Sequence, residues 1–498
     1  MKKYILAIDQ GTTSSRAIIF DKLKNVVGSS QMNLNLYSPK SGWAEQNANE
    51  IWETVFEVIK DVINSSDIDM GEIAGIGITN QRETTILWDK VTGKPVYNAI
   101  VWQSRQSQNI CDDLIQKGYS ELIKEKTGLL INPYFSASKI KWIFDNVAGV
   151  YEKAQKGNIL FGTVDTFLVW KLTNGKRFIT DASNASRTML FNINTLEWDD
   201  ELLNLFNIPK SILPEVVDSS GVYGICEKLW EINEDVDIPV ASIIGDQQAS
   251  LFGQCCFQTG DIKNTYGTGC FMLMNTKDKI VKSNYGLLST IAWKYDGVVE
   301  YALEGSVFVG GEAVRWLRDK MRLFENSKDV EKYSNRYKGS DGVYMVPAFV
   351  GLGTPYWDND ARGAVFGLTS QTKKEHFINA TVESIAYQSK DVMEVMVKES
   401  GLKINSLAVD GGASCNNYLM QFQADILDCK IKRPECLETT ALGAAYLAGL
   451  ATKLWKSKQE LLKLHGVEQI FMGNMSKEER EKLYKGWKKA VEATRAFK

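Results

Sequence analysis

The stretch that decides the fold lies at the start of the chain and reads Tyr4-Ile5-Leu6-Ala7-Ile8-Asp9-Gln10-Gly11-Thr12-Thr13-Ser14-Ser15-Arg16. An apolar run at 4–8 ends at Asp9, a turn rich in glycine and hydroxyl side chains follows, and a second apolar run covers 16–20. This pattern predicts a buried strand, a tight turn and another strand. Backbone N–H groups in such a turn bind anions, and hydroxyls add donors. The candidate phosphate ligands here are Thr12, Thr13, Ser14 and Arg16. An ordinary hairpin is the competing interpretation.

A similar pattern lies in the second half of the chain. Runs at 262–266 and 270–274 that we interpret as strands flank Gly267-Thr268-Gly269, which makes Thr268 another candidate phosphate ligand. Two further elements recur in the same order: the stretches 75–79 and 407–412, and the strand-to-helix junctions 244–249 and 441–445. Short repeats also arise by chance, but this order favours a duplication. It predicts two related α/β domains facing one cleft, which we assign to residues 1–250 and 251–498.

Strand-like runs alternate with helical patterns along the whole chain, which is typical of a layered α/β protein. The predicted strands are 4–8, 16–20, 73–79, 85–88, 159–162, 240–244, 262–266, 270–274 and 406–410. The predicted helices are 49–64, 108–117, 137–146, 249–254, 310–323, 374–399, 416–427 and 439–451.

Composition excludes several classes of protein. The 498 residues include 58 Lys and Arg against 61 Asp and Glu, so no basic field is available for nucleic acid. The 2 histidines, His376 and His465, cannot form a zinc motif, and the 8 cysteines form no CxxC pair. We expect free thiols and a cytoplasmic protein. The apolar run after Lys3 is too short for a signal peptide, and no run is long enough to insert into a membrane.

Common nucleotide-binding motifs are missing from the sequence. It contains no GxxxxGK[ST] loop, no GxGxxG loop and no His-Arg-Asp of a protein kinase. Any nucleotide is therefore held by neither a P-loop nor a Rossmann turn.

Two acidic residues at the ends of predicted strands are candidates for catalysis or metal binding. Asp246 follows an apolar strand and a glycine, so it is a candidate general base or metal ligand, with a helix N-cap as the alternative. Asp9 ends the first strand and is a candidate ligand for Mg²⁺. Arg82 and Glu83 lie in a polar stretch between two apolar runs, where they could bind a polyhydroxylated ligand or form a charged turn.

Several segments together resemble the FGGY carbohydrate kinases, most closely the members that phosphorylate glycerol. The resemblance covers essentially the whole chain. The matching segments are 7–16, 77–84, 184–188, 245–248, 266–269 and 410–412, with the two family signatures at 134–146 and 363–383.

The resemblance implies an actin-like fold of two ribonuclease-H-like domains, with mixed sheets flanked by helices around an interdomain cleft. It implies phosphorylation of glycerol by ATP with Mg²⁺, with Asp246 as general base and Asp9 and Asp246 as metal ligands. The implied glycerol ligands are Arg82, Glu83, Trp102, Tyr134, Asp246, Gln247 and Phe271. The implied ATP ligands are Thr12, Thr13, Ser14, Arg16, Thr268, Gly311, Arg315, Gly412 and Asn416.

The chain departs from the family at two nucleotide-site positions. Glu312 replaces a small residue and Arg315 replaces a glutamine, which leaves the role of Arg315 open. The alternatives are an FGGY kinase acting on a pentulose or a sugar acid, and a non-catalytic actin-like sensor. Retention of both Asp9 and Asp246 argues against the sensor. The resemblance also implies a homodimer or homotetramer, without choosing between them.

Overall fold

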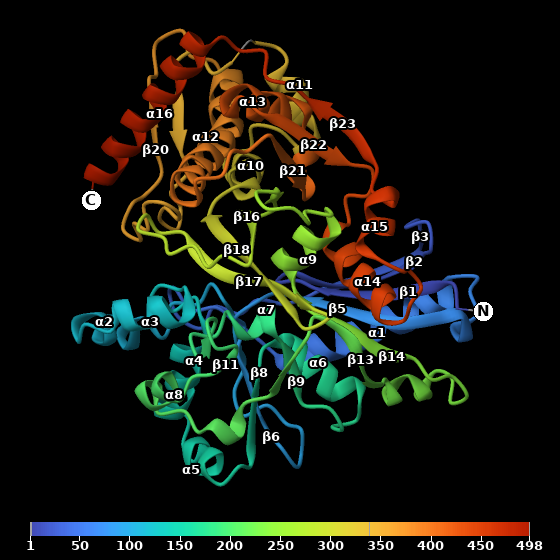
Figure 1. Cartoon of the computed structure of the whole chain (residues 1–498). Coiled ribbons are helices and arrows are strands. Elements are labelled where there is room, and N and C mark those ends of the chain that lie inside the picture. The colour runs from blue at the N-terminus through green and yellow to red at the C-terminus, as the bar shows by residue number, and fades with distance from the viewer. Residues whose placement is uncertain (1, 338, 498) are drawn as a thin grey trace.

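Two mixed β-sheets form the core, one in each half of the chain (Figure 1). The computed structural model describes residues 2–337 and 339–497. The N-terminal sheet has the strand order β13-β14-β5-β1-β2-β3, and the C-terminal sheet has the order β17-β18-β16-β15-β21-β22-β23. In Figure 1 the first sheet lies among the blue and green elements, and the second lies above it among the yellow to red elements.

Every predicted strand and helix is present, with ends shifted by a few residues. The N-terminal sheet consists of β1 (Tyr4–Gln10), β2 (Ser14–Asp21), β3 (Val26–Asn33), β5 (Ile73–Asn80), β13 (Ser220–Ile225) and β14 (Pro239–Gly245). The C-terminal sheet consists of β15 (Ile262–Tyr266), β16 (Cys270–Lys277), β17 (Leu288–Tyr295), β18 (Val298–Val307), β21 (Ser406–Asp410), β22 (Lys430–Pro434) and β23 (Val467–Phe471). The shorter predicted strands are β6 (Ile86–Asp89) and β8 (Ile159–Gly162). The predicted helices are α1 (Ala48–Ser65), α2 (Gln108–Gln116), α4 (Ser136–Asn146), α9 (Asp246–Gly253), α10 (Gly311–Asp319), α12 (Lys374–Ser400), α13 (Asn417–Leu427) and α14 (Thr439–Ala451).

The two sheets share one topology, which confirms the predicted duplication. β1 pairs antiparallel with β2 and parallel with β5, and β15 pairs in the same way with β16 and β21. β14 and β22 then extend the two sheets in parallel, and each leads into a helix, α9 or α14. Both glycine turns are therefore hairpins, as the competing interpretation held. A hairpin turn can still bind a ligand, so this does not decide their role.

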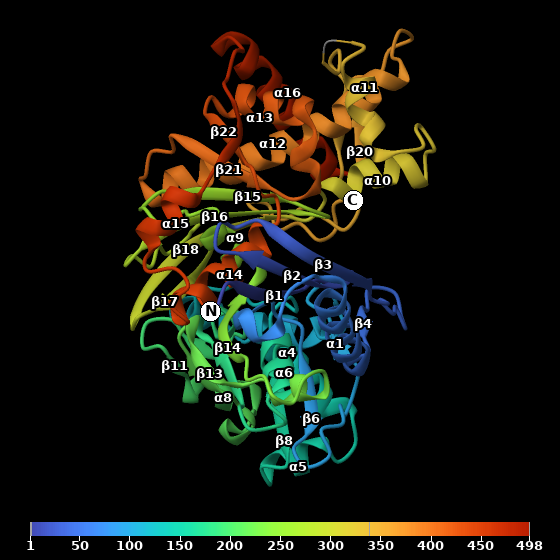
Figure 2. The same cartoon turned by 90° about the vertical axis from the view of Figure 1, so that its right-hand side faces the viewer.

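Helices α9 and α14 lie between the two sheets, and each contacts the opposite half (Figure 2). On α14, the carbonyl of Ala444 accepts a hydrogen bond from Ser242 of β14 at 2.7 Å. On α9, Ser250 donates to Asp410 of β21 at 2.7 Å. The helices cross so closely that a Cβ on Gly443 would lie 1.8 Å from a carbonyl oxygen of α9. This crossing brings the strand ends of both halves to one region.

The predicted boundary between residues 250 and 251 falls inside α9, so the division of the chain into two domains at that point stays a prediction. Within the described residues, no helix has both the length and the apolar character needed to cross a membrane.

Strands β17 and β18 form a hairpin that the apolar-run pattern did not predict. Its turn contains Asp296 and Gly297, both with positive φ (53° and 73°), as in a type I′ turn. Strand β18 carries Glu304, a fully buried carboxylate that pairs with Arg82 of the N-terminal half.

Candidate active site

Asp9 and Asp246 lie at the same edge of the N-terminal sheet. In the parallel pairing of β1, β5 and β14, Asp9 and Ile244 both lie opposite Thr79. Asp246 follows two residues after Ile244, so the strand ends bring the two acids together. Burial raises the pKa of Asp9 to about 7, the Arg16 guanidinium opposes that shift, and Asp246 adds to it. The two carboxylates therefore repel each other, and a bound cation would relieve this repulsion.

Asp246 is fixed on one side and accessible on the other. Gly245 is the N-cap of α9 and Asp246 is the first helical residue, so the alternative of Asp246 as N-cap is wrong. Its Oδ1 accepts the backbone N–H of Gln247 at 2.7 Å and lies 3.2 Å from Nε of Arg82, while 26% of the side chain is exposed. Burial raises the pKa of Asp246, and the charges of Arg82 and Lys263 oppose the shift. A held, accessible carboxylate with a raised pKa is suited to accept a proton.

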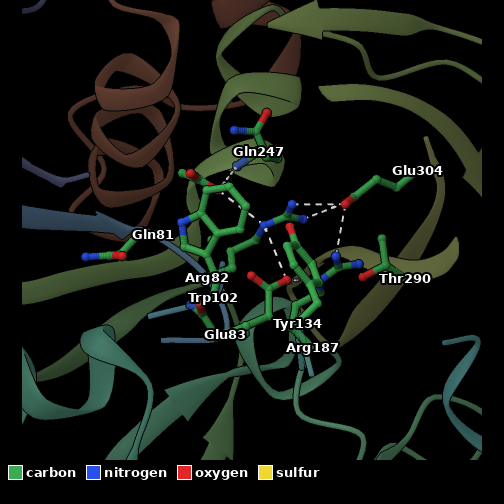
Figure 3. Close-up of polar contacts among 12 residues, drawn as sticks. Gln81, Arg82, Glu83, Trp102, Tyr134, Arg187, Gln247, Thr290 and Glu304 are labelled. Carbon is green, nitrogen blue, oxygen red and sulfur yellow. Dashed lines mark hydrogen bonds and ion pairs between the residues drawn. The ribbon is translucent and has the colours of Figure 1, made fainter. Parts of the chain in front are cut away.

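Arg82 and Arg187 are held by two buried carboxylates (Figure 3). Glu304 accepts from Nη1 and Nη2 of Arg82 at 2.5 and 3.0 Å, and from Nη2 of Arg187 at 2.9 Å. Glu83 accepts from Nε of Arg187 at 2.6 Å. Burial alone would favour the neutral acid, but the guanidinium groups of Arg187 and Arg82 lower the pKa of Glu304 to about 2. The network fixes Arg82 so that its Nε faces Asp246.

An aromatic group joins this network to the first glycine turn. The ring centroids of Trp102 and Tyr134 are 5.5 Å apart, and those of Trp102 and Phe271 are 6.2 Å apart. Figure 3 shows Trp102 and Tyr134 beside Arg82. The indole Nε1 of Trp102 donates to Oγ1 of Thr12 at 2.8 Å. Trp102 therefore connects the other aromatic candidate glycerol ligands to Thr12, a candidate phosphate ligand.

Gln247 is oriented by a buried lysine. Nζ of Lys263 donates to Oε1 of Gln247 at 2.6 Å and to Oγ1 of Thr265 at 2.7 Å. Burial lowers the pKa of Lys263 to about 8, and the carboxylates of Asp410 and Asp246 oppose this shift. Because Lys263 holds the amide oxygen of Gln247, the amide N–H₂ group of Gln247 points away from Lys263.

The second glycine turn is packed against the N-terminus of α10. The backbone N–H groups of Gly310 and Gly311 donate to Thr268 and Gly267 at 2.8 and 2.9 Å. On the next turn of the helix, Nη2 of Arg315 donates to Oγ1 of Thr268 at 2.8 Å. Gly311, Arg315 and Thr268, three of the candidate ATP ligands, are thus brought together.

The charge of Arg315 is not free in this structure. Its Nη2 also lies 2.5 Å from a carboxylate oxygen of Glu312, one turn earlier on α10. The two departures from the family pattern are therefore ion-paired with each other.

The remaining candidate ATP ligands lie on two other elements. A Cβ built on Gly412 would meet no atom within 4 Å, so the backbone there is open to a ligand. The side-chain oxygen of Asn416 accepts from the backbone N–H of Leu419 at 2.9 Å and caps α13. Arg16 forms two hydrogen bonds, at 2.6 and 2.8 Å, with Glu438 of the C-terminal half. Its guanidinium is therefore already paired.

The described residues include no group of three or more His, Cys, Asp or Glu side chains arranged to hold a metal ion. Mg²⁺ does not need such a group, since it is commonly bound by one or two carboxylates together with waters and substrate phosphates. The pair Asp9 and Asp246, whose charges repel each other, fits that kind of site.

Four residues of the site were not given a role from the sequence: Arg187, Lys263, Glu304 and Glu438. A signal existed for Lys263, because it lies inside a predicted strand and a buried lysine is seldom without a partner. Glu304 and Glu438 had none, since their partners lie 222 and 422 residues away.

Comparison with known proteins agrees with this geometry. Residues 4–253 match the model of the N-terminal domain of the FGGY family of carbohydrate kinases, and residues 262–452 match the model of its C-terminal domain. The chain belongs to the FGGY family of carbohydrate kinases. The resemblance found in the sequence and the actin-like, two-domain α/β fold that it implied are confirmed.

This FGGY kinase is 60% identical over 498 residues to the glycerol kinase of Bacillus licheniformis, with both chains fully covered. The crystal structure of Plasmodium falciparum glycerol kinase with ADP is similar at a TM-score of 0.91 and 38% identity, over 99% of this chain and 98% of that one. A ligand-bound xylulose kinase of Lactobacillus acidophilus is similar at a TM-score of 0.88 and 23% identity, over 99% and 98% of the two chains. At that identity the similarity shows a common fold alone.

Proposed function

We propose that this FGGY kinase transfers the γ-phosphoryl group of ATP to a primary hydroxyl of glycerol, giving sn-glycerol 3-phosphate and ADP. The observation that carries the proposal is the carboxylate of Asp246, which lies 3.2 Å from Nε of Arg82, itself held by Glu304. Asp246 follows β14 at the sheet edge where Asp9 ends β1, the strand that leads into the Thr12 turn. The full-length similarity to proteins named glycerol kinase supports glycerol over a pentulose or a sugar acid.

Glycerol has three hydroxyl groups and few apolar atoms, so hydrogen bonds must supply most of its recognition. Arg82, Glu83, Tyr134, Asp246 and Gln247 provide charged and polar groups for the hydroxyls. Trp102 and Phe271 provide apolar surface for the carbon chain. Because Arg82 and Glu83 are locked in a network with Glu304 and Arg187, these groups are oriented before glycerol arrives.

Asp246 is the proposed general base. Its carboxylate orients the attacking hydroxyl of glycerol and accepts the proton of that hydroxyl as the oxygen attacks the γ-phosphorus. The new bond joins this oxygen to phosphorus, and the bond between the γ-phosphorus and the oxygen that bridges to the β-phosphate breaks, so that ADP leaves. Phosphoryl transfer relies on such positioning and on charge stabilisation more than on covalent chemistry.

The two glycine turns are the proposed phosphate ligands. Thr12, Thr13 and Ser14 present hydroxyl and N–H groups from the β1–β2 turn, with Arg16 beside them. Thr268 presents a hydroxyl from the β15–β16 turn. The residue is exposed, and because its oxygen accepts from Arg315, its O–H can still donate to a phosphate. Gly311, Arg315, Gly412 and Asn416 are proposed to line the rest of the nucleotide site.

Asp9 and Asp246 are the residues that would hold Mg²⁺. When bound, the ion would neutralise charge on the phosphate oxygens during transfer. Asp9 would have to be ionised to bind it, which the Arg16 guanidinium favours and burial opposes.

We also propose that the enzyme is cytoplasmic, that its partners are glycerol and ATP or ADP, and that it binds no nucleic acid. A homodimer or homotetramer stays a prediction.

The proposal is tested by measuring ADP release with Mg-ATP across glycerol, dihydroxyacetone, xylulose and gluconate. We expect glycerol to have the highest kcat/KM of the panel. Faster turnover of xylulose or gluconate than of glycerol would contradict the proposed substrate while leaving the kinase assignment intact. No turnover of any member would favour a non-catalytic sensor.

A further inference from the structure

A buried ammonium group without a carboxylate partner lies behind the candidate glycerol site. Lys139, in the first turn of α4, is 0% exposed. Its Nζ donates to the backbone carbonyls of Tyr134 at 2.5 Å, Glu83 at 3.2 Å and Phe135 at 3.3 Å. A lysine ammonium has three N–H donors, so all three are used by main-chain carbonyls. Among the described residues it forms no ion pair.

The carbonyl of Glu83 is held unusually firmly. Glu83 has a φ of 60°, in the left-handed region that residues other than glycine rarely adopt. Besides Lys139, its carbonyl accepts hydrogen bonds from Oγ of Ser136 and Oγ1 of Thr85, each at 3.1 Å. A residue in this conformation persists only where its surroundings determine it. Three donors on one oxygen supply that determination.

The three carbonyls belong to the two segments that carry candidate glycerol ligands. Glu83 follows Arg82 in the turn after β5, and its carboxylate holds Arg187. Tyr134 belongs to the loop before α4, and its ring packs edge-on against Trp102. Lys139 therefore ties these two segments together, as Ser136 also does. Among the described residues, none of its hydrogen bonds goes to the acidic pair or to the phosphate turns.

Burying an ammonium group to connect two segments costs free energy, because the charge is removed from water. Burial lowers the pKa of Lys139 to about 7, with the charge of Glu83 opposing the shift. A purely structural contact could be made at lower cost by an apolar side chain. The choice of an ammonium is explained if three carbonyls must be oriented at one point.

We infer that Lys139 is a positioning residue for glycerol, whose ammonium group holds the Glu83 and Tyr134 segments in the arrangement that the substrate requires. This inference rests on the proposed function and deepens it, because it assigns substrate positioning to a residue that cannot itself touch glycerol.

The first test is Lys139→Met, which keeps the length of the side chain and removes the three donors. We expect the KM for glycerol to rise about tenfold or more, because hydrogen bonds from a charged group are lost. The KM for ATP should stay within about twofold. Lys141→Met is the matched control, since Lys141 lies on the same helix and pairs with Asp145 at the surface. It should change neither KM.

Ser136→Ala is the second test, and it decides the matter if Lys139→Met does not fold by circular dichroism. It removes one of the three donors to the Glu83 carbonyl and leaves Lys139 in place. We expect a smaller rise in the KM for glycerol, with the KM for ATP unchanged.

The inference is overturned if the folded variants keep the wild-type KM for glycerol, or if both KM values rise together as a general loss of structure would produce. The wild-type protein in the same assay separates this outcome from failure of the proposed function. If the wild type does not phosphorylate glycerol, both fall. If it does and the variants behave like it, the positioning role alone falls.

Discussion

Replacing Glu304 by glutamine should affect both stability and glycerol recognition. Glu304 accepts three hydrogen bonds at 2.5 to 3.0 Å from Arg82 and Arg187, and none of its surface is exposed. Glutamine keeps the shape of the side chain but removes its charge and places an amide N–H₂ group against two guanidinium groups. Among the described residues, Glu83 is then the fully buried carboxylate that still faces them.

The magnitude follows from the loss of a buried counter-charge. Breaking a buried ion pair by removing one partner costs about 3–5 kcal/mol. For a chain of this size, that loss should lower the Tm by on the order of 5 °C. Arg82 is no longer held with its Nε toward Asp246, so we also expect kcat/KM for glycerol to fall about 10- to 100-fold, which corresponds to roughly 1.4–2.8 kcal/mol.

The assay compares Glu304→Gln with Glu300→Gln on the same strand. Glu300 is also buried and ion-paired, but its partners are Lys277 and Lys458, away from the Arg82 network. Thermal unfolding and glycerol kinetics are measured for both variants. Glu300→Gln should lose stability and keep the wild-type KM for glycerol. If Glu304→Gln also keeps that KM and kcat, the claim that Glu304 fixes Arg82 for substrate binding is wrong.

Two further predictions concern nucleotide binding and pH. Arg315→Gln should raise the KM for ATP about threefold to tenfold, because the substitution removes a charge next to Thr268. The KM for glycerol should stay unchanged. An unchanged KM for ATP would show that Arg315 makes no contact with the nucleotide. Burial raises the pKa of Asp165 to about 7, against hydrogen bonds from Thr163 and Thr180. The folded protein therefore binds this proton more tightly than the unfolded chain, and the Asp165 contribution to stability is lost as pH rises from about 4 to 7. Asp165→Asn should remove this contribution, which changes the free energy of unfolding by on the order of 1 kcal/mol per pH unit. The measurement is the Tm of variant and wild type across this pH range. An identical dependence of Tm on pH in the two proteins would contradict the prediction.

Much of the fold could be predicted because its signals are local. The strand–turn–strand pattern around Gly11 and its counterpart around Gly267 depend on neighbouring residues, and both became β-hairpins beside a parallel strand. The hairpin β17–β18 was not predicted, although the dipeptide Asp296-Gly297 in its turn is a strong local signal for a type I′ turn.

The arrangement of the site could be predicted only in part. Asp9 and Asp246 were placed correctly at strand ends, because parallel neighbours bring those ends to one edge. The partners of Arg82 and Arg16 could not be found in this way, since Glu304 and Glu438 meet them only after the two halves have packed together. Charge pairing across such distances leaves no periodic trace in the sequence.

The central claim, that Asp246 accepts the proton of glycerol, is tested most directly by the turnover of Asp246→Asn. Asparagine keeps the size of the side chain and an oxygen that can accept the N–H of Gln247, but it cannot serve as a base. We expect kcat for glycerol phosphorylation to fall on the order of 100-fold or more, while calorimetry shows that glycerol and ATP still bind. Turnover close to that of the wild type would contradict the assigned role.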